Sequence, residues 1–361
     1  MKNRLSALHI VALVSAPVLL SAAAVCILCF FIPRMPFANA SAAPEYRIQA
    51  ASGTTMYAVG KELKKNGIIR SSRFFYLYAR LHRTNLKAGI YKVNSTMSIR
   101  EICALLNSGK QEYISVAIAE GLTLNKTAAL LEAKGVTNAQ EFKKAAQDPS
   151  LLKKFNISAA SFEGYLFPDT YNFDPLMMKP EKVIDILVHT FFSKIADISE
   201  LKGKTPEELH KVVILASIVE REYRVKEEAA LIASVFTNRL KDNIGLYSCA
   251  TVEYILTELQ GKAHPELIKI EDTKIDNPYN TYKWAGLPPG PISNPGLTAL
   301  KAAAAPPQTG YYYFRLTDAQ KGTHSFSADF DNHKKAGTDM LGASGTIRTK
   351  KAAGSVQDVQ K

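Results

Sequence analysis

The side chain best placed for chemistry is Glu220, which follows an apolar run that begins at Val212. Between Val212 and Val219 the one polar residue is Ser217. Pro206 and the acidic pair after it are typical of the first turn of a helix, so we expect a buried helix that ends near Glu220. Because burial disfavours the charged form of a carboxyl group, the pKa of Glu220 is expected to be raised, which suits a general acid.

A structural role is the alternative. Glu220 would then mark the point where a core helix reaches solvent, and it would pair with Arg221 or Arg224. Glu222 lies two positions further on, about 200° around the helix axis from Glu220. The two carboxylates therefore cannot face one cleft, and we expect one of them to support the site or to form an ion pair.

Motifs for other kinds of catalysis are missing. The sequence has no Gly-x-Ser-x-Gly, no His-Glu-x-x-His and no Gly-x-x-x-x-Gly-Lys-Ser/Thr, and its seven histidines are scattered. Cys103 and Cys249 are too far apart in sequence for a metal motif; we expect two unpaired thiols, and a bridge between them stays open. This leaves carboxylate chemistry with no metal and no cofactor, and the acidic candidates are Glu120, Glu163, Glu220 and Glu222.

The N-terminus predicts a membrane anchor. Residues 10–32 carry no charge, and as a helix they would be roughly 35 Å long, enough to cross a bilayer. Lys2 and Arg4 precede the run, which predicts a cytoplasmic N-terminus at 1–9 and an extracytoplasmic remainder. A cleaved signal peptide, with a small-residue site at Ala38–Ala40, is the alternative, but the apolar run exceeds the usual signal core of about 7–15 residues.

The net charge limits the class of partner. A charge of +12 over 361 residues and a pI near 9.3 predict attraction to an anionic partner: a nucleic acid, a lipid headgroup or an acidic wall polymer. The lysines are spread over many segments and no nucleic-acid-binding motif is present, so we expect no nucleic acid.

The remaining patterns predict an α+β fold in two parts. Short strands flank helices in the first part, where Ser98 followed by Glu101 predicts a capped helix that Gly109 ends. The expected divisions are a linker at 33–45, a small α+β module at 46–112, a larger mixed α/β domain at 113–337 and a flexible basic tail at 338–361.

Several separated segments occur in the order found in one known family. They are Phe162–Tyr171, Ser217–Glu222, Asn277–Tyr282, Gly286–Ile292, and Gly322–Phe326 with His333 downstream. Together they resemble the endolytic murein transglycosylase (YceG-like) family, and the resemblance covers roughly residues 46–336.

The resemblance implies that the first module is LysM-like and that Glu220 is the catalytic residue. Lytic transglycosylases cleave the bond between N-acetylmuramic acid and N-acetylglucosamine without water. Glu220 would protonate the leaving oxygen, and its carboxylate would then take the proton of the muramyl hydroxymethyl group as that group attacks the anomeric carbon. The substrate supplies the nucleophile, so no second catalytic carboxylate is needed.

Further site residues follow from the same resemblance. We expect sugar contacts, or orientation of Glu220, from Glu163, Asn280, Tyr282, Thr251 and Glu222. Hydrogen bonds that only stabilise loops are the alternative for these residues.

The sequence departs from the family at two places. Ser248–Val252 replaces the usual Ser-Asp-Pro-Thr-Val, which removes an acid and a proline, and Tyr223 replaces a threonine. A weaker activity or an altered substrate register is therefore expected. Cys249 is expected to be buried and inert, with oxidative inactivation as the alternative.

Two hypotheses remain open. The first is a membrane-tethered enzyme that cuts nascent glycan strands outside the cytoplasmic membrane, beside penicillin-binding protein synthases. The second is a non-catalytic scaffold that binds peptidoglycan through its LysM-like module.

Overall fold

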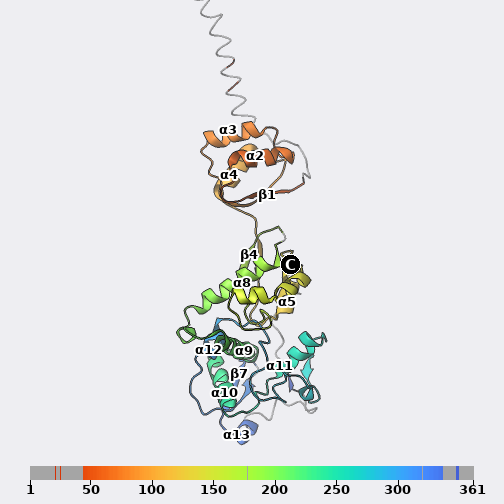
Figure 1. Cartoon of the computed structure of the whole chain (residues 1–361), viewed down its shortest axis with the longest axis vertical. Helices are drawn as coiled ribbons and strands as arrows, with labels where there is room; N and C mark the ends of the chain where they lie inside the picture. The colour runs from red at the N-terminus through yellow and green to blue at the C-terminus, as the bar shows by residue number, and fades with distance from the viewer. Residues whose placement is uncertain are drawn as a thin grey trace, which may run out of the picture. The chain divides into compact units, whose positions relative to one another are not determined.

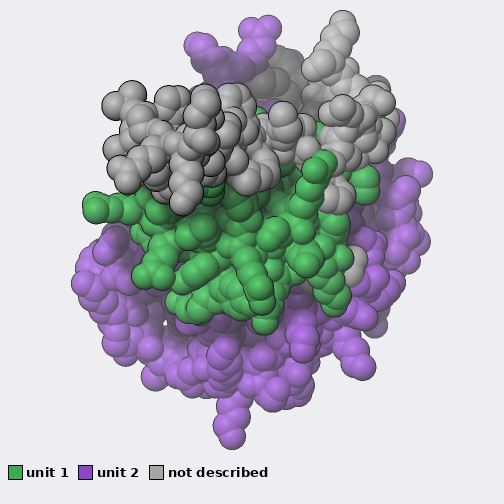
Figure 2. Space-filling model, turned by 90° about the horizontal axis from the view of Figure 1, so that it is seen from above, with its two compact units in different colours: residues 1–113 green, residues 114–361 purple. Residues whose placement is uncertain are grey.

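The computed structural model describes residues 44–176, 178–318 and 320–335, together with Ser21, Val25 and the short strand at 347–348. The chain divides into two compact units, 1–113 and 114–361 (Figures 1 and 2). The predicted membrane segment at 10–32 and the predicted tail lie almost wholly outside the described residues. Among the residues that are described, no helix is long and apolar enough to span a bilayer.

Unit 1 is built in the order strand, helix, helix, strand, helix. Its two strands pair antiparallel, with Tyr46 opposite Val93. A core of its own, which includes Phe75, Tyr91 and Leu106, lies between the strands and the helices. The elements are β1 (Tyr46–Ala50), α2 (Met56–Lys65), α3 (Ser72–Leu81), β2 (Gly89–Val93) and α4 (Ile99–Ser108).

The caps of unit 1 are local and readable in the sequence. The hydroxyl groups of Thr55 and Ser71 accept hydrogen bonds from the first turns of α2 and α3. Ser98 and Glu101 form the predicted capping box of α4. Gly109, with φ of 71°, ends α4 in a left-handed conformation that favours glycine. The predicted helix and its stop are therefore confirmed.

The first half of unit 2, up to residue 222, is mostly helical. Strands β3 and β4 pair antiparallel, with Val116 opposite Tyr171. The first elements are β3 (Ile114–Ala117), α5 (Leu124–Ala133), α6 (Ala139–Ala145), α7 (Pro149–Lys154), β4 (Thr170–Phe173), α8 (Pro180–Ile195), η2 (Ser199–Leu201) and α9 (Pro206–Glu222).

The second half of unit 2 is richer in loops. Strands β6 and β7 form a hairpin, and β5 pairs with β8. The elements are η3 (Lys226–Glu228), α10 (Ala229–Lys241), α11 (Cys249–Tyr254), the π-helical turn η4 (Ile255–Leu259), β5 (Leu267–Ile268), η5 (Asp272–Lys274), α12 (Leu297–Ala304), β6 (Tyr313–Asp318), β7 (Thr323–Ser327), α13 (Phe330–Lys335) and β8 (Ile347–Arg348).

Helix α9 is the central element of unit 2. A capping box of Thr205 and Glu208, with Pro206 in the first turn, starts the helix where the sequence predicts it. Every residue from Val213 to Arg221 is buried, and α10 and α12 pack against the helix. The fold is thus α+β, with helices and separate two-stranded antiparallel sheets in the part that the structure describes.

Candidate active site

Glu220 lies in the last turn of α9 and is only 5% exposed. The hydroxyl of Tyr223 donates to its two carboxyl oxygens at 3.1 and 3.3 Å, and the backbone N–H of Gly296 donates to Oε2 at 3.0 Å. Both donors orient the same carboxyl group, one from the end of α9 and one from the start of α12. The neighbouring Arg221 pairs instead with Glu253, at 2.6 Å.

The loop that carries Gly296 is fixed to α9 by Ser217. This side chain is the one polar residue in the apolar run, and it is fully buried. Its Oγ accepts a hydrogen bond from the N–H of Ile292 at 3.0 Å, and its carbonyl accepts one from the hydroxyl of Ser293 at 3.0 Å. A hydroxyl inside the core of α9 therefore sets the position of the loop that reaches Glu220.

Asn294 connects the same loop to two distant segments. It is fully buried, and its Oδ1 accepts from the N–H groups of Gly164 and Leu166 at 2.8 and 3.0 Å. Its Nδ2 donates to the carbonyl of Leu122 at 3.0 Å and to Oε1 of Glu163 at 3.2 Å. Sequence reasoning missed this residue; the one local signal is an asparagine before a proline, at the end of a Gly- and Pro-rich loop.

Glu163 belongs to this network and not to an open surface. Its two oxygens accept from the N–H of Leu124, at the start of α5, at 2.9 and 3.0 Å. Burial raises the pKa of Glu163 to about 8, against the opposing effect of the hydrogen bond from Leu124. Glu163 is thus linked to Glu220 through Asn294 and the chain that leads to Gly296.

Glu120, one of the four acidic candidates, lies beside the hydrogen bond to Glu220. A Cβ atom placed on Gly296 would come within 2.3 Å of Oε1 of Glu120, so the carboxylate lies directly against this glycine. Burial, followed by the charges of Glu220 and Glu120, raises the pKa of Tyr223 above its usual range. Glu120 is exposed, so a buried and an exposed carboxylate flank one phenol.

Glu222 lies on another side of α9, as the helical geometry requires. It is partly exposed and accepts a hydrogen bond from the hydroxyl of Ser248. The next residue, Cys249, has its Sγ 3.0 Å from the hydroxyl of Tyr282. Burial raises the pKa of Cys249 to about 12 and also raises the pKa of Tyr282, and the charge of Glu222 adds to both effects.

The cysteines of the folded units are free, as expected. Cys103 lies in unit 1 and Cys249 in unit 2. Burial raises the pKa of Cys103 to about 11, so neither thiol is present as the reactive thiolate at neutral pH.

Asn280 and Thr251 are both fully enclosed by protein. The amide of Asn280 donates to the carbonyls of Thr273 and Ile275 at 2.9 and 2.7 Å, and accepts from the N–H of Tyr282 at 3.0 Å. The hydroxyl of Thr251 donates to the carbonyl of Ser248 at 2.7 Å. These contacts are the loop-stabilising hydrogen bonds that the sequence left open as the alternative.

The candidate residues therefore form two groups. Glu163 joins Glu220 through the Asn294 network, whereas the other four surround the Ser248–Cys249 segment and connect to α9 through Glu222. No group of three or more His, Cys, Asp and Glu side chains that could hold a metal ion occurs in the described parts of the chain. The geometry supports acid–base chemistry by a single oriented carboxyl group.

Comparison with known proteins places the chain in a family. The sequence profile of the YceG-like family matches residues 48–339. The endolytic murein transglycosylase of Bacillus subtilis is 32% identical over 80% of this chain and 83% of its own length. That of Streptococcus pneumoniae is 29% identical over 78% of this chain, which spans 56% of the longer streptococcal protein.

A solved structure agrees with the fold. The crystal structure of a YceG-like protein from Listeria monocytogenes superposes with a TM-score of 0.55 at 30% identity, and it covers 81% of this chain and 99% of the Listeria chain. With the family profile matching most of its length, the chain belongs to the YceG-like family.

Proposed function

We propose that this chain is a lytic transglycosylase that cleaves the bond between N-acetylmuramic acid and N-acetylglucosamine in peptidoglycan. The observation that carries the proposal is the geometry of Glu220, a buried carboxyl group held by Tyr223 and by the N–H of Gly296. The relatives named endolytic murein transglycosylases support the substrate class.

The geometry suits a group that changes protonation state twice in one turnover. Glu220 first gives its proton to the glycosidic oxygen, which leaves as a hydroxyl group. The resulting carboxylate then accepts the proton of the muramyl C6 hydroxyl as that oxygen bonds to C1, which closes the anhydro ring. The hydroxyl of Tyr223 can donate to the carboxylate and accept from the protonated acid, so the same contact serves both states.

The alternative reaction is hydrolysis of the glycosidic bond, and Glu120 is the candidate for its second carboxylate. A glycoside hydrolase needs a second carboxylate, as nucleophile or as the base that activates water. Glu120 lies against Gly296 and is exposed to solvent, so it is the residue that would take this role. The products separate the reactions: an anhydromuramyl end marks the transglycosylase, and a reducing end marks the hydrolase.

The test uses the full chain with purified glycan strands and mass spectrometry of the products. We expect anhydromuramyl ends from the native chain and a loss of at least about 100-fold in Glu220→Gln, the scale of general-acid catalysis. Glu207→Gln is the matched control, because it removes the same charge from an exposed position in the first turn of α9 and should retain most of the activity. Reducing ends, or full activity in Glu220→Gln, would contradict the proposal.

We further propose a place in the cell for this reaction. Residues 10–32 would form a single-pass anchor in the cytoplasmic membrane, with the folded units outside, where nascent strands emerge. Cleavage there would terminate glycan elongation beside penicillin-binding protein synthases. Fusion of a reporter enzyme that is active only outside the cytoplasm to the C-terminus tests the orientation.

Unit 1 is proposed to be the LysM-like module of the family. Its strand–helix–helix–strand order, with β1 antiparallel to β2, supports this assignment. The alternative function, a non-catalytic peptidoglycan-binding scaffold, would rely on this unit for affinity. Binding of strands without any cleavage would favour that alternative.

A further inference from the structure

The positive charge of the chain is concentrated in unit 1. Residues 45–113 hold twelve Lys and Arg against four Asp and Glu, a net charge of +8. Residues 114–335 hold 26 against 27, a net charge of −1. The basic pI of the whole protein is therefore not a general property of its surface, since the unit proposed to carry catalysis is nearly neutral.

The four carboxylates of unit 1 are engaged away from the outer face of α2 and α3. Glu45 and Glu112 form ion pairs with residues of the strands, Lys92 and Arg47 respectively. Glu101 caps α4, and Glu62 accepts a hydrogen bond from Tyr46 at the start of β1. Basic side chains on α2, α3 and the turn after α3 are exposed; they include Lys61, Lys64, Lys65, Arg73, Arg80 and Arg83.

Apolar side chains are exposed among these cations. Leu77 and Leu81 of α3 are 48% and 65% exposed, and they lie on one side of the helix because they are four residues apart. Tyr57 and Tyr76 are also exposed, and their rings meet edge to face at 5.8 Å between α2 and α3. In Figure 1, α3 lies on the side of unit 1 away from β1. The outer surface of α2 and α3 thus carries a high density of positive charge, with the leucines on one side of α3 and Tyr76, about 100–140° around the helix, on the side that meets α2.

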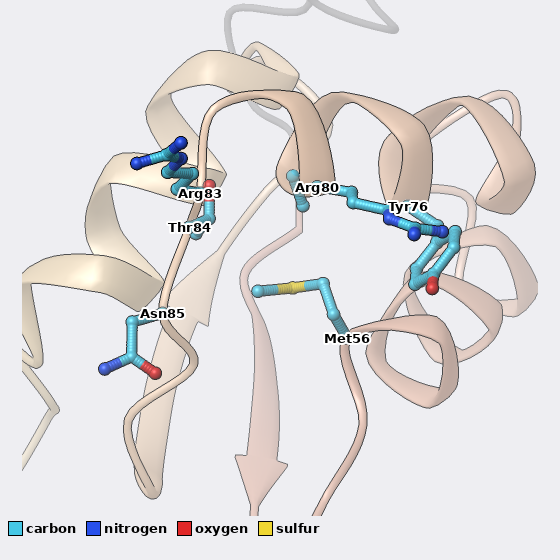
Figure 3. A pocket seen from close by; sticks show the side chains of 7 residues that line it. Met56, Tyr76, Arg80, Arg83, Thr84 and Asn85 are labelled. Atoms are coloured by element: carbon cyan, nitrogen blue, oxygen red, sulfur yellow. The ribbon is translucent and has the colours of Figure 1, made fainter.

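A pocket of about 400 Å³ lies within this face. Figure 3 shows Met56 pointing into it from the start of α2, and Arg80 extending towards Tyr76. The lining includes two arginines, and in Figure 3 Arg83 points away from Arg80, so the two guanidinium groups add positive charge to the face at separate places. The lining residues are Met56, Tyr76, Ala79, Arg80, Arg83, Thr84 and Asn85.

We propose that the α2–α3 face of unit 1 binds the surface of a bilayer that contains anionic phospholipid. Leu77 and Leu81 enter the headgroup region, the surrounding Lys and Arg side chains attract the negative surface, and Arg80 and Arg83 each contact lipid phosphates separately. The inference does not depend on the transglycosylase reaction, because it concerns residues of unit 1 only.

A bilayer fits this face better than an uncharged glycan does. Carboxylates of a wall polymer would also attract these cations, and each Lys or Arg near an anionic membrane contributes about 1 kcal/mol of attraction, so it is the apolar side chains that favour the bilayer. Two exposed leucines on one helix side also have no use in a purely electrostatic contact. If residues 10–32 span the membrane, the linker at 33–45 would keep unit 1 within about 45 Å of it.

The experiment is hydrogen exchange of the full chain mixed with phosphatidylcholine vesicles, with or without phosphatidylglycerol. We expect the amides of α3 to exchange more slowly only when phosphatidylglycerol is present, and this protection to fade as salt is added. Both kinds of vesicle allow the N-terminal segment to insert. The difference in exchange between the two therefore reports the effect of phosphatidylglycerol alone.

Two variants and one matched control sharpen the test. Arg80→Gln with Arg83→Gln should weaken the phosphatidylglycerol-dependent protection by about 30-fold in lipid concentration, the equivalent of two surface charges. Leu77→Ser with Leu81→Ser should also weaken it, with the salt dependence retained. Arg100→Gln with Lys110→Gln removes the same charge from unit 1 outside α2 and α3 and should have little effect.

Three results would overturn the proposal. The first is equal exchange of α3 with both vesicles. The second is an equal effect of the control pair and the Arg80 and Arg83 pair, which would mean diffuse attraction without a defined face. The third is protection of α3 by glycan fragments or by inorganic phosphate and not by phosphatidylglycerol vesicles, which would assign the face to another ligand.

Discussion

At the scale of single residues, the site depends on one carboxyl group and its two donors. Tyr223 stands where the family usually has threonine, and its phenol reaches both oxygens of Glu220. A threonine hydroxyl is attached much closer to the main chain, so the contact with Glu220 in this chain has its own geometry. The altered residue therefore touches the proposed acid directly.

The first prediction concerns this phenol. Tyr223→Phe should lower kcat about 10- to 150-fold, because the ring is retained while a hydrogen bond to a charged group, worth about 1.5–3 kcal/mol, is lost. The alkaline limb of the pH–rate profile should move to higher pH, since the carboxylate form of Glu220 loses a donor. An unchanged profile with reduced activity would indicate a packing role only.

At the scale of elements, the site is held by contacts between segments that are far apart in sequence. Asn294 and Glu163 are 131 residues apart, and Asn294 and Leu122 are 172 apart. The carboxylate of Glu163 closes this network at the first N–H of α5. A change at Glu163 should consequently lower the free energy of unfolding more than it lowers the rate of the reaction.

A second prediction follows for the pH dependence of folding. The pKa of Glu163 is raised from 4.5 to about 8 by burial, so the folded state binds this proton more tightly than the unfolded state does. The resulting stabilisation is complete below about pH 4.5 and is lost as the pH rises to about 8. Across this window the native chain should lose a few kcal/mol that Glu163→Gln does not lose. Urea unfolding at pH 5 and pH 8 measures this, and parallel changes in both proteins would refute it.

Sequence patterns predicted the local features of these elements and not the contacts between them. The capping box at Ser98, the start of α9 at Pro206 and the burial of Glu220 follow from neighbouring residues, and the structure shows them. Asn294 was missed because its amide partners come from distant segments. The side chains of Asn280 and Thr251 are enclosed, and polarity alone does not distinguish a loop bond from a ligand bond, so their contact with a sugar stays a prediction.

At the scale of the whole molecule, the two units have separate cores and different net charges. The hydrophobic core of unit 1 contains only residues of unit 1. The two hydrophobic clusters of unit 2 contain only residues of unit 2. Unit 1 carries +8 while the described main part of unit 2 is close to neutral. We expect the units to fold and to bind independently.

A third prediction tests this independence. Leu106→Ala removes a fully buried side chain of unit 1 and should cost about 2–5 kcal/mol there. Hydrogen exchange in α2 and α3 should accelerate, whereas α9 and α12 should exchange as in the native chain. Faster exchange in all four helices would show that the two cores unfold as one.

The hydrogen bond from Gly296 to Glu220 has a consequence for substitutions at this position. Its donor belongs to the main chain, so exchange of the side chain at this position cannot delete it, and only proline, which has no N–H, would. A mutation of Gly296 can change the size of the side chain, and an added Cβ atom would meet the side chain of Glu120. A substitution at position 296 other than proline therefore keeps the donor of the acid and changes only the space beside Glu120.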